Sequence, residues 1–170
     1  MNNTVRQVVI TVVVVLVAFL ALQSVVQSFK VQGESMEPTF ESGEFLMVDK
    51  VTYHFRDPHR GDVVIFYRNP TELYIKRIIG EPGDTVSFKN GKAYIDGVLL
   101  EEDPQMRTTN GVTAEVPEGE YYVLGDNRIN SRDSRQGWTI TEEDIVGRVW
   151  MRYWPVGHIG FPSAYSATLE

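Results

Sequence analysis

A serine in the stretch GESMEPTF, residues 33–40, is the first residue whose surroundings suit nucleophilic catalysis. The common serine-hydrolase signatures do not fit it. A G-x-S-x-G elbow would need a glycine where the chain has Glu37, and S-x-x-K would need a lysine where Pro38 stands. A Ser-His-Asp triad would have to recruit a distant histidine. The remaining chemistry for Ser35 is activation by a lysine.

Lys76, in the segment LYIKRIIG, is the lysine best placed for such a role. An ordinary lysine is a poor base near neutral pH because its pKa is about 10.4, and burial among apolar neighbours lowers that pKa. In a strand, alternate residues share a face, so Lys76 lies beside Tyr74 and Ile78. The alternative is that Lys76 reaches solvent from an edge strand and has no chemical role.

A third polar cluster is GDNRINSRDSR, residues 125–135. Gly, Asp, Asn and Ser are ordinary turn residues, so a plain loop is one interpretation. The alternation of acids and arginines favours another, in which charge-assisted hydrogen bonds stiffen a loop beside a catalytic centre. Ser131 would then aim a nearby amine.

The composition excludes several kinds of site and partner. The chain has 170 residues with 16 Lys+Arg and 23 Asp+Glu, and its net charge of −7 argues against nucleic-acid binding. It contains no cysteine, which excludes disulfides, thiolate metal sites and a cysteine nucleophile. The histidines lack ligand spacing, so we expect no metal and no cofactor; they are His54, His59 and His158.

An apolar run near the start must position whatever follows it. The nineteen residues from Val8 to Val26 would span about 28 Å as a helix, close to the roughly 30 Å of a bilayer core. A cleavable signal peptide is the alternative, but Ala18 and Ala21 have the wrong spacing for its cleavage site. We therefore predict a short cytoplasmic tail and transmembrane anchor over residues 1–28.

The rest of the chain, residues 29–170, is predicted to form one mainly β domain. Strands rich in β-branched and aromatic residues are expected within 44–53, 61–68, 72–80, 84–100, 119–127 and 145–154. Asn90-Gly91 and Asp96-Gly97 predict a three-stranded meander. Residues 141–145 predict a short helical turn. We expect antiparallel, coiled sheets in a barrel-like arrangement.

Taken in order, these segments resemble the type I signal peptidase family. The resemblance covers most of residues 28–150 and rests on the anchor followed by four motifs, which are SMEPT (35–39), RGDVVIF (60–66), YIKRIIGEPGD (74–84) and GDNRINSRDSR (125–135). It implies a signal-peptidase fold and a membrane-bound serine endopeptidase with its catalytic domain outside the cytoplasm. Its substrates would be exported preproteins cut after an Ala-x-Ala site.

The resemblance also implies roles for individual residues. Ser35 would be the nucleophile, Lys76 the general base and Ser131 the residue that positions the lysine. Four charged residues would support the site, namely Arg77, Asp126, Asp133 and Arg135. Seven residues would form the substrate pockets, namely Val31, Gln32, Gly33, Met36, Phe40, Tyr74 and Ile75. The backbone N–H of Ser35 would stabilise the oxyanion, and Gly33 stands where some members carry a second, hydroxyl donor.

Three alternatives remain at this point. A non-catalytic relative acting as an assembly chaperone would not need both Ser35 and Lys76. A self-cleaving repressor of the DNA-damage response would need a DNA-binding segment in place of the apolar run. An anchored binding domain would leave the motifs unexplained. The aromatic residues Trp150, Tyr153, Trp154 and Phe161 belong either to the core or to a membrane interface.

Overall fold

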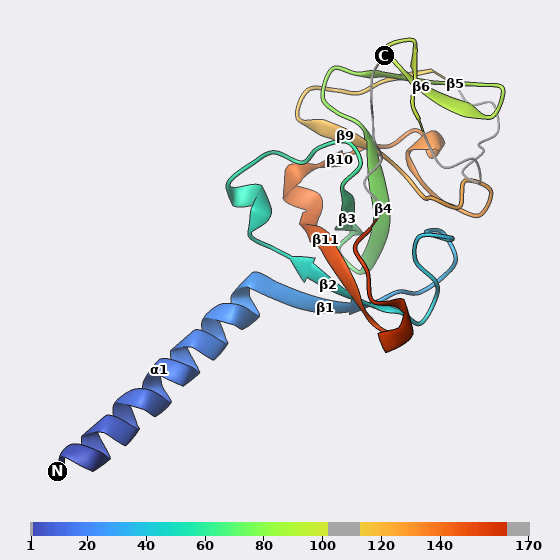
Figure 1. The fold of residues 1–170 in the computed structure, drawn as a ribbon. Coiled ribbons are helices and arrows are strands. Elements are labelled where there is room, and N and C mark those ends of the chain that lie inside the picture. Colours follow the sequence, from blue (N-terminus) through green and yellow to red (C-terminus); the bar gives the residue numbers. More distant parts are fainter. Residues whose placement is uncertain (1, 102–112, 163–170) are drawn as a thin grey trace.

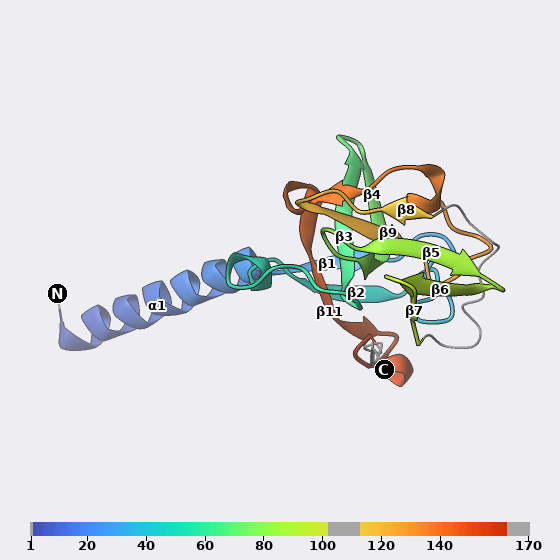
Figure 2. The same ribbon diagram turned by 90° about the horizontal axis from the view of Figure 1, so that it is seen from above.

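A computed structural model describes residues 2–101 and 113–162 of the chain. One long helix, α1 (Asn3–Val25), projects away from a β domain that contains all the strands (Figure 1). Figure 2 shows the same separation from a direction at right angles. Within the described residues, no helix has the length and apolarity needed to cross a membrane.

The larger sheet has seven strands, all paired antiparallel, in the order β1-β2-β11-β3-β4-β9-β10. Alternating burial sets its register: in β2, Leu46 and Val48 are buried while their neighbours are partly exposed. The strands are β1 (Val26–Lys30), β2 (Phe45–Asp49), β3 (Val63–Asn69), β4 (Glu72–Gly80), β9 (Glu120–Leu124), β10 (Ile140–Thr141) and β11 (Ile145–Trp154).

The smaller sheet has four strands in the order β7-β6-β5-β8 and lies beside the C-terminal end of β4. The predicted meander is present, because Asn90, Gly91, Asp96 and Gly97 all have positive φ, as two-residue hairpin turns require. The strands are β5 (Thr85–Lys89), β6 (Lys92–Ile95), β7 (Val98–Leu99) and β8 (Ala114–Glu115).

Short 3-10 turns connect several of these strands. They are η1 (Thr52–His54), η2 (Ser134–Gln136), η3 (Glu142–Asp144) and η4 (Val156–His158). The helical turn predicted at residues 141–145 corresponds to η3, where the Asp144 carboxylate accepts hydrogen bonds from the backbone N–H and hydroxyl of Thr141. Acids at its start suit a helix N-terminus.

The predicted mainly β, antiparallel fold is confirmed, with differences in detail. Among the described residues, the larger sheet ends at β1 and β10 without closing into a barrel. The apolar run was predicted to stay helical through Val26, yet that residue begins β1 and pairs with Asp49. Valine favours a strand where the edge of a neighbouring strand offers hydrogen-bond partners. The proposed division at residues 28/29 stays a prediction.

The buried core consists of three apolar clusters arranged along the sheets. One fills the space under the smaller sheet around Val86 and Ile95. The second packs β2 and β3 against the segment that follows β1, and the third covers the other face of β3 and β4. Of the two interpretations of the aromatic residues between positions 150 and 161, packing in the core is wrong, because Trp150, Trp154 and Phe161 are 45%, 52% and 68% exposed.

Candidate active site

A groove crosses the domain between the segment that leads to Ser35 and the strand that carries Lys76. Each neighbouring pair from β1 through β2, β11 and β3 to β4 is antiparallel, so β1 and β4 run in the same direction. Strand β9 pairs only with Arg77–Gly80, which leaves the N-terminal half of β4 with a free edge. The groove has a volume of about 890 Å³ and contains Ser35 and Lys76 in its lining.

Ser35 lies in a turn that hydrogen bonds fix from both sides. Val31 continues the β1 alignment by donating its N–H to the Glu44 carbonyl, and Gly33 then turns the chain with φ +85°. After the serine, Phe40 N–H donates to the Met36 carbonyl. The carbonyl of Ser35 itself accepts from Asn127 N–H at 3.1 Å. The serine is therefore held on a defined turn at the end of the groove.

Lys76 is buried, with only 4% of its surface exposed. Its Nζ donates to Ser35 Oγ at 2.7 Å and to the Ile75 carbonyl at 2.8 Å. The Tyr74 ring centroid is 5.4 Å from the same nitrogen. Desolvation by burial lowers the pKa of Lys76 from 10.5 to about 8, in opposition to the nearby Asp133 and Asp126 carboxylates. The amine is thus poised to exchange a proton with the serine hydroxyl near neutral pH.

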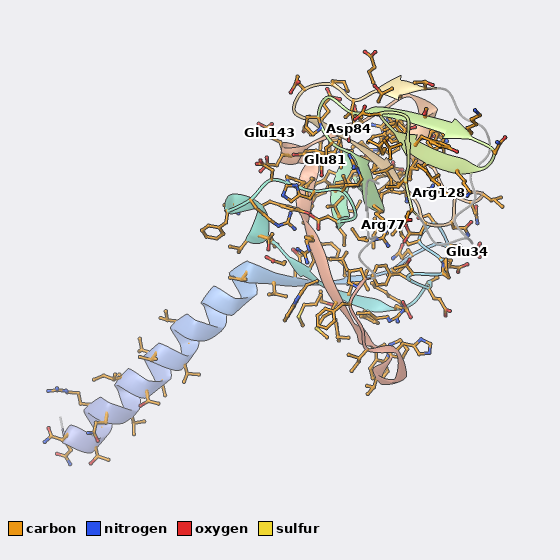
Figure 3. All side chains as sticks on the ribbon, turned by 45° about the horizontal axis from the view of Figure 1, so that its top comes forward. Glu34, Arg77, Glu81, Asp84, Arg128 and Glu143 are labelled. Carbon is orange, nitrogen blue, oxygen red and sulfur yellow. The ribbon has the colours of Figure 1, made fainter. Side chains whose placement is uncertain are left out.

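Arg77, the next residue on β4, points to the opposite side and forms a buried ion pair. Its Nε and Nη2 donate to the two carboxylate oxygens of Asp126 at 2.9 and 2.7 Å, and both side chains have no exposed surface. Thr39 Oγ1 also donates to Asp126, at 2.5 Å. This network joins β4, the Ser35 turn and the 125–135 loop. Arg77 is labelled in Figure 3.

Thr39 was not predicted as a member of the site. It lies in the SMEPT motif, but a threonine four residues after a serine carries no chemical signal in the sequence. Its role follows only from the position of Asp126, 87 residues away along the chain.

The second half of the 125–135 loop is tied together by Asp133. Its buried carboxylate accepts from the Gly125 N–H at 3.2 Å and from Arg135 Nε at 2.8 Å. A Cβ added to Gly125 would lie 2.3 Å from Ser131 Oγ and 2.4 Å from the Ser35 carbonyl oxygen. Gly125 therefore lies so close to both serines that no side chain fits at this position.

Ser131 lies near Ser35, with Gly125 between them, and makes no hydrogen bond to Lys76. Its Oγ is buried and has no hydrogen-bond partner among the described residues. The role of Ser131 in positioning the lysine stays a prediction.

Five of the seven predicted pocket residues line the groove, and two do not. The lining residues are Val31, Gln32, Gly33, Tyr74 and Ile75. Met36 and Phe40 are each 1% exposed and belong to the core cluster that also contains Val31, Leu46 and Ile65. They therefore pack behind the wall of the groove, because their apolar bulk is better buried than exposed to it.

Other lining residues could not be predicted from the sequence. Leu46 and Ile65 form part of the apolar floor, and Asn130 and Arg132 lie at its border. Glu34, labelled in Figure 3, accepts from Asn130 Nδ2 at 2.8 Å beside Ser35. Alternation within β2 shows that Leu46 faces inward, and Ile65 lies in a run of four buried residues of β3, but which cavity they face depends on strand order. Among the described residues, no acid or histidine cluster could hold a metal ion.

Comparison with known proteins decides the family. Residues 4–154 match the family described as "Signal peptidase, peptidase S26". The chain belongs to this family. A probable signal peptidase I-2 of Synechocystis sp. is 39% identical over 143 residues, covering 76% of this chain and 64% of that protein. The signal peptidase I of Bacillus caldolyticus is 39% identical, covering 81% and 84% of the two chains.

Two more signal peptidases resemble the chain. The signal peptidase IB of Staphylococcus aureus is 35% identical over 82% of this chain and 83% of its own. Among solved structures, a signal peptidase I from Enterococcus faecalis V583 is 34% identical and covers 55% of this chain and 97% of that one, with a TM-score of 0.49. The predicted signal-peptidase resemblance is confirmed, and with it the predicted class of enzyme.

Proposed function

We propose that the chain is a serine endopeptidase that removes signal peptides from exported preproteins through a Ser35–Lys76 dyad. The observation that carries the proposal is the 2.7 Å contact between Lys76 Nζ and Ser35 Oγ in a buried setting that lowers the lysine pKa to about 8. Signal peptidases act on exported preproteins. A non-catalytic chaperone would gain nothing from holding a buried amine against a hydroxyl.

The dyad supplies the proton transfers of the reaction. As Ser35 Oγ bonds to the scissile carbonyl carbon, its proton passes to the neutral Lys76 amine across the contact already present. The resulting ammonium then protonates the leaving nitrogen as the C–N bond breaks. A water molecule next attacks the ester and gives its proton to Lys76, which returns one to Ser35 as the acid is released.

The oxyanion of this reaction needs a hydrogen-bond donor beside Ser35. Among the described residues, the backbone N–H of Ser35 has no hydrogen-bond partner, so it is free to donate to the developing charge. Position 33 is glycine and offers no hydroxyl, and a Cβ built there meets nothing within 4 Å. The turn thus supplies at least one main-chain donor. In other enzymes, one such donor stabilises the transition state by about 2.7–4 kcal/mol.

The substrate is expected to add as a strand between the two edges of the groove. Residues before the cut would lie beside those that precede Ser35 and Lys76, in the gap between the β1 side and the free half of β4. A strand in this position would complete the barrel-like arrangement. The apolar floor, formed by Val31, Leu46, Ile65 and Ile75, would accept small side chains and exclude large ones.

We also assign membrane attachment to the N-terminal helix, with the β domain outside the cytoplasm. The signal peptidase I family is membrane-associated. The described side chains of α1 include a run of valines, Val12 to Val15, each at least half exposed and without a protein partner that would cover them. An exposed apolar surface of this extent is typical of a segment that contacts lipid.

The test is cleavage of a preprotein by purified protein in detergent. Cleavage after the last alanine of an Ala-x-Ala site, established by sequencing the new N-terminus, is the expected result. A matched preprotein with leucine in place of both alanines should resist, because the proposed apolar floor accepts only small side chains. Equal cleavage of both preproteins, or none of either by folded protein, would contradict the proposal.

A further inference from the structure

Two of the described arginines of the β domain differ from the others in having neither a carboxylate nor a backbone carbonyl as a partner of the guanidinium. The remaining described arginines from Arg56 onward each reach a carboxylate or a backbone carbonyl, as in the pairs of Arg60 with Asp84 and Arg152 with Glu44. Within the described residues, Arg68 and Arg132 have neither an ion pair nor a hydrogen bond from the guanidinium.

Both arginines line the same cavity, which adjoins the catalytic groove. This second cavity has a volume of about 470 Å³, and Arg132, Glu72 and Tyr74 line both it and the groove. Trp138 forms another wall, and Arg68 stacks over its ring with Cζ 4.6 Å from the centroid. Stacking fixes the plane of the guanidinium and leaves the N–H groups at its edge free to bind an anion.

The lining of the cavity carries a net positive charge. Glu72 is the one acid in its lining, and the carboxylate of Glu72 already accepts a hydrogen bond from Asn69 Nδ2 at 2.6 Å. The opposite face of β4 presents Ile75 to the apolar floor. The two faces of this strand thus offer different chemistry to a neighbouring peptide.

The register of a bound strand decides which substrate residue meets the arginines. Side chains alternate between faces along a strand, so the residues flanking the middle of an Ala-x-Ala site share one face and the middle residue takes the other. The two alanines require the apolar floor beside Ile75. The middle side chain then projects to the face of Tyr74, two residues before Lys76, where the second cavity opens.

We propose that Arg68 and Arg132 form a cationic subsite that favours an acidic side chain at the middle position of the Ala-x-Ala cleavage site. This inference rests on the proposed signal-peptide cleavage and adds a substrate preference to it. The attraction acts between exposed charges, so the preference is modest and weakens at high salt. A basic side chain at the same position is disfavoured by repulsion.

The test compares three peptides that differ only in the middle residue, which is glutamate, glutamine or lysine. For each enzyme the readout is the ratio of kcat/KM for the glutamate peptide to that for the lysine peptide. This ratio cancels changes in the amount of folded enzyme and in its general activity. The enzymes are wild type, Arg68→Gln/Arg132→Gln, and the matched charge control Lys89→Gln/Lys92→Gln on the distant β5–β6 hairpin.

We expect a ratio of about ten for wild type at low salt, falling towards one at high salt. The ratio should fall to near one in the arginine variant and stay near the wild-type value in the lysine control. A wild-type ratio near one with good cleavage of the glutamine peptide overturns the subsite and leaves the proposed function standing. A ratio that persists in the arginine variant also overturns it. Failure of wild type to cleave the glutamine peptide instead contradicts the proposed function, and the subsite with it.

Discussion

Lys76 owes its chemistry to its position on β4 rather than to its residue type. The side chain is buried, and its Nζ still reaches Ser35 Oγ and the Ile75 carbonyl. Burial removes water from the ammonium and favours the neutral amine, while the acidic neighbours Asp133 and Asp126 limit how far the pKa falls. A pKa of about 8 leaves roughly a tenth of the lysine neutral at pH 7, several hundred times more than an unperturbed lysine.

Activity should therefore depend on pH in a defined direction. Because the neutral amine is the base, kcat/KM should rise about tenfold per pH unit below the lysine pKa and level off above pH 8. The measurement is kcat/KM against pH with a peptide that has no titrating group in this range. A profile that is flat through neutrality would show that Lys76 is not the group being titrated. One that keeps rising towards pH 10.5 would show that burial does not lower its pKa.

At the residue scale, the sequence could predict the dyad but not everything around it. Strand alternation in LYIKRIIG places Lys76 among apolar neighbours, and the structure buries it. Met36 and Phe40 were expected in the pockets because the resemblance placed them there, and their burial behind the wall depends on the packing of β2 and β3. The contact of Thr39 with Asp126 is long-range and has no sequence pattern.

The element that organises the site is the 125–135 loop between β9 and β10. It contacts the Ser35 turn through Asn127 and contacts β4 through the ion pair of Asp126 with Arg77. At Gly125 the loop leaves no room for a side chain, because a Cβ there would lie 2.4 Å from the Ser35 carbonyl oxygen. The loop thus sets the position of the nucleophile relative to the lysine.

Gly125→Ala tests this close approach. The added Cβ would lie 2.4 Å from the backbone oxygen of Ser35, which is too short for any real contact, so the nucleophile or the loop must move. We expect kcat/KM to fall by about 100-fold or more, since small displacements of a nucleophile have effects of that order. The matched control is Gly157→Ala, whose Cβ meets nothing within 4 Å, and it should leave kcat/KM unchanged. Equal activity of the two variants would contradict the account of the loop.

Arg77→Met tests the ion pair that connects the loop to β4. It leaves the Asp126 carboxylate buried and without its partner, and breaking a buried pair in this way costs about 3–5 kcal/mol of unfolding free energy. The measurement is urea unfolding of the purified domain. Arg148→Met is the control: its 3.6 Å contact with Asp62 is partly exposed, and the loss should stay below about 1 kcal/mol. A similar loss of unfolding free energy in both variants would show that the buried pair stabilises the domain no more than the partly exposed one.

At the element scale, long patterned strands were predictable and short ones were not. The segments that became β3, β4 and β11 have enough β-branched and aromatic residues to be recognised, and the two hairpin turns followed from Asn-Gly and Asp-Gly. Strands β8 and β10 have two residues each, too few for a period to be seen. Strand β1 follows α1 directly, and its start at Val26 depends on pairing with β2 rather than on local sequence.

The whole molecule combines a projecting helix with a β domain whose groove begins close to it. Strand β1 follows α1 directly (Figures 1 and 2). Ser28, which lines the groove, lies three residues after the helix ends. If α1 lies in a membrane, as proposed, the lining of the groove begins a few residues from the bilayer. The arrangement suits cleavage close to a bilayer.

Removing residues 1–25 should separate attachment from catalysis. A fragment that begins at Val26 keeps β1 and its pairing with β2, so the β domain should stay folded and cleave a soluble peptide. The full chain should remain in the membrane fraction after a high-salt wash and enter solution only with detergent. If the fragment and the full chain fractionate identically, α1 is not the attachment.

The most direct test of the central claim is a side-by-side comparison of wild type, Ser35→Ala and Lys76→Ala on one Ala-x-Ala preprotein. Circular dichroism of each protein shows whether it is folded, and the new N-terminus of each product is sequenced. The dyad predicts cleavage after the alanine by wild type and a loss of at least about 1,000-fold in both variants, which remain folded. Near-wild-type cleavage by folded Lys76→Ala or Ser35→Ala would contradict it.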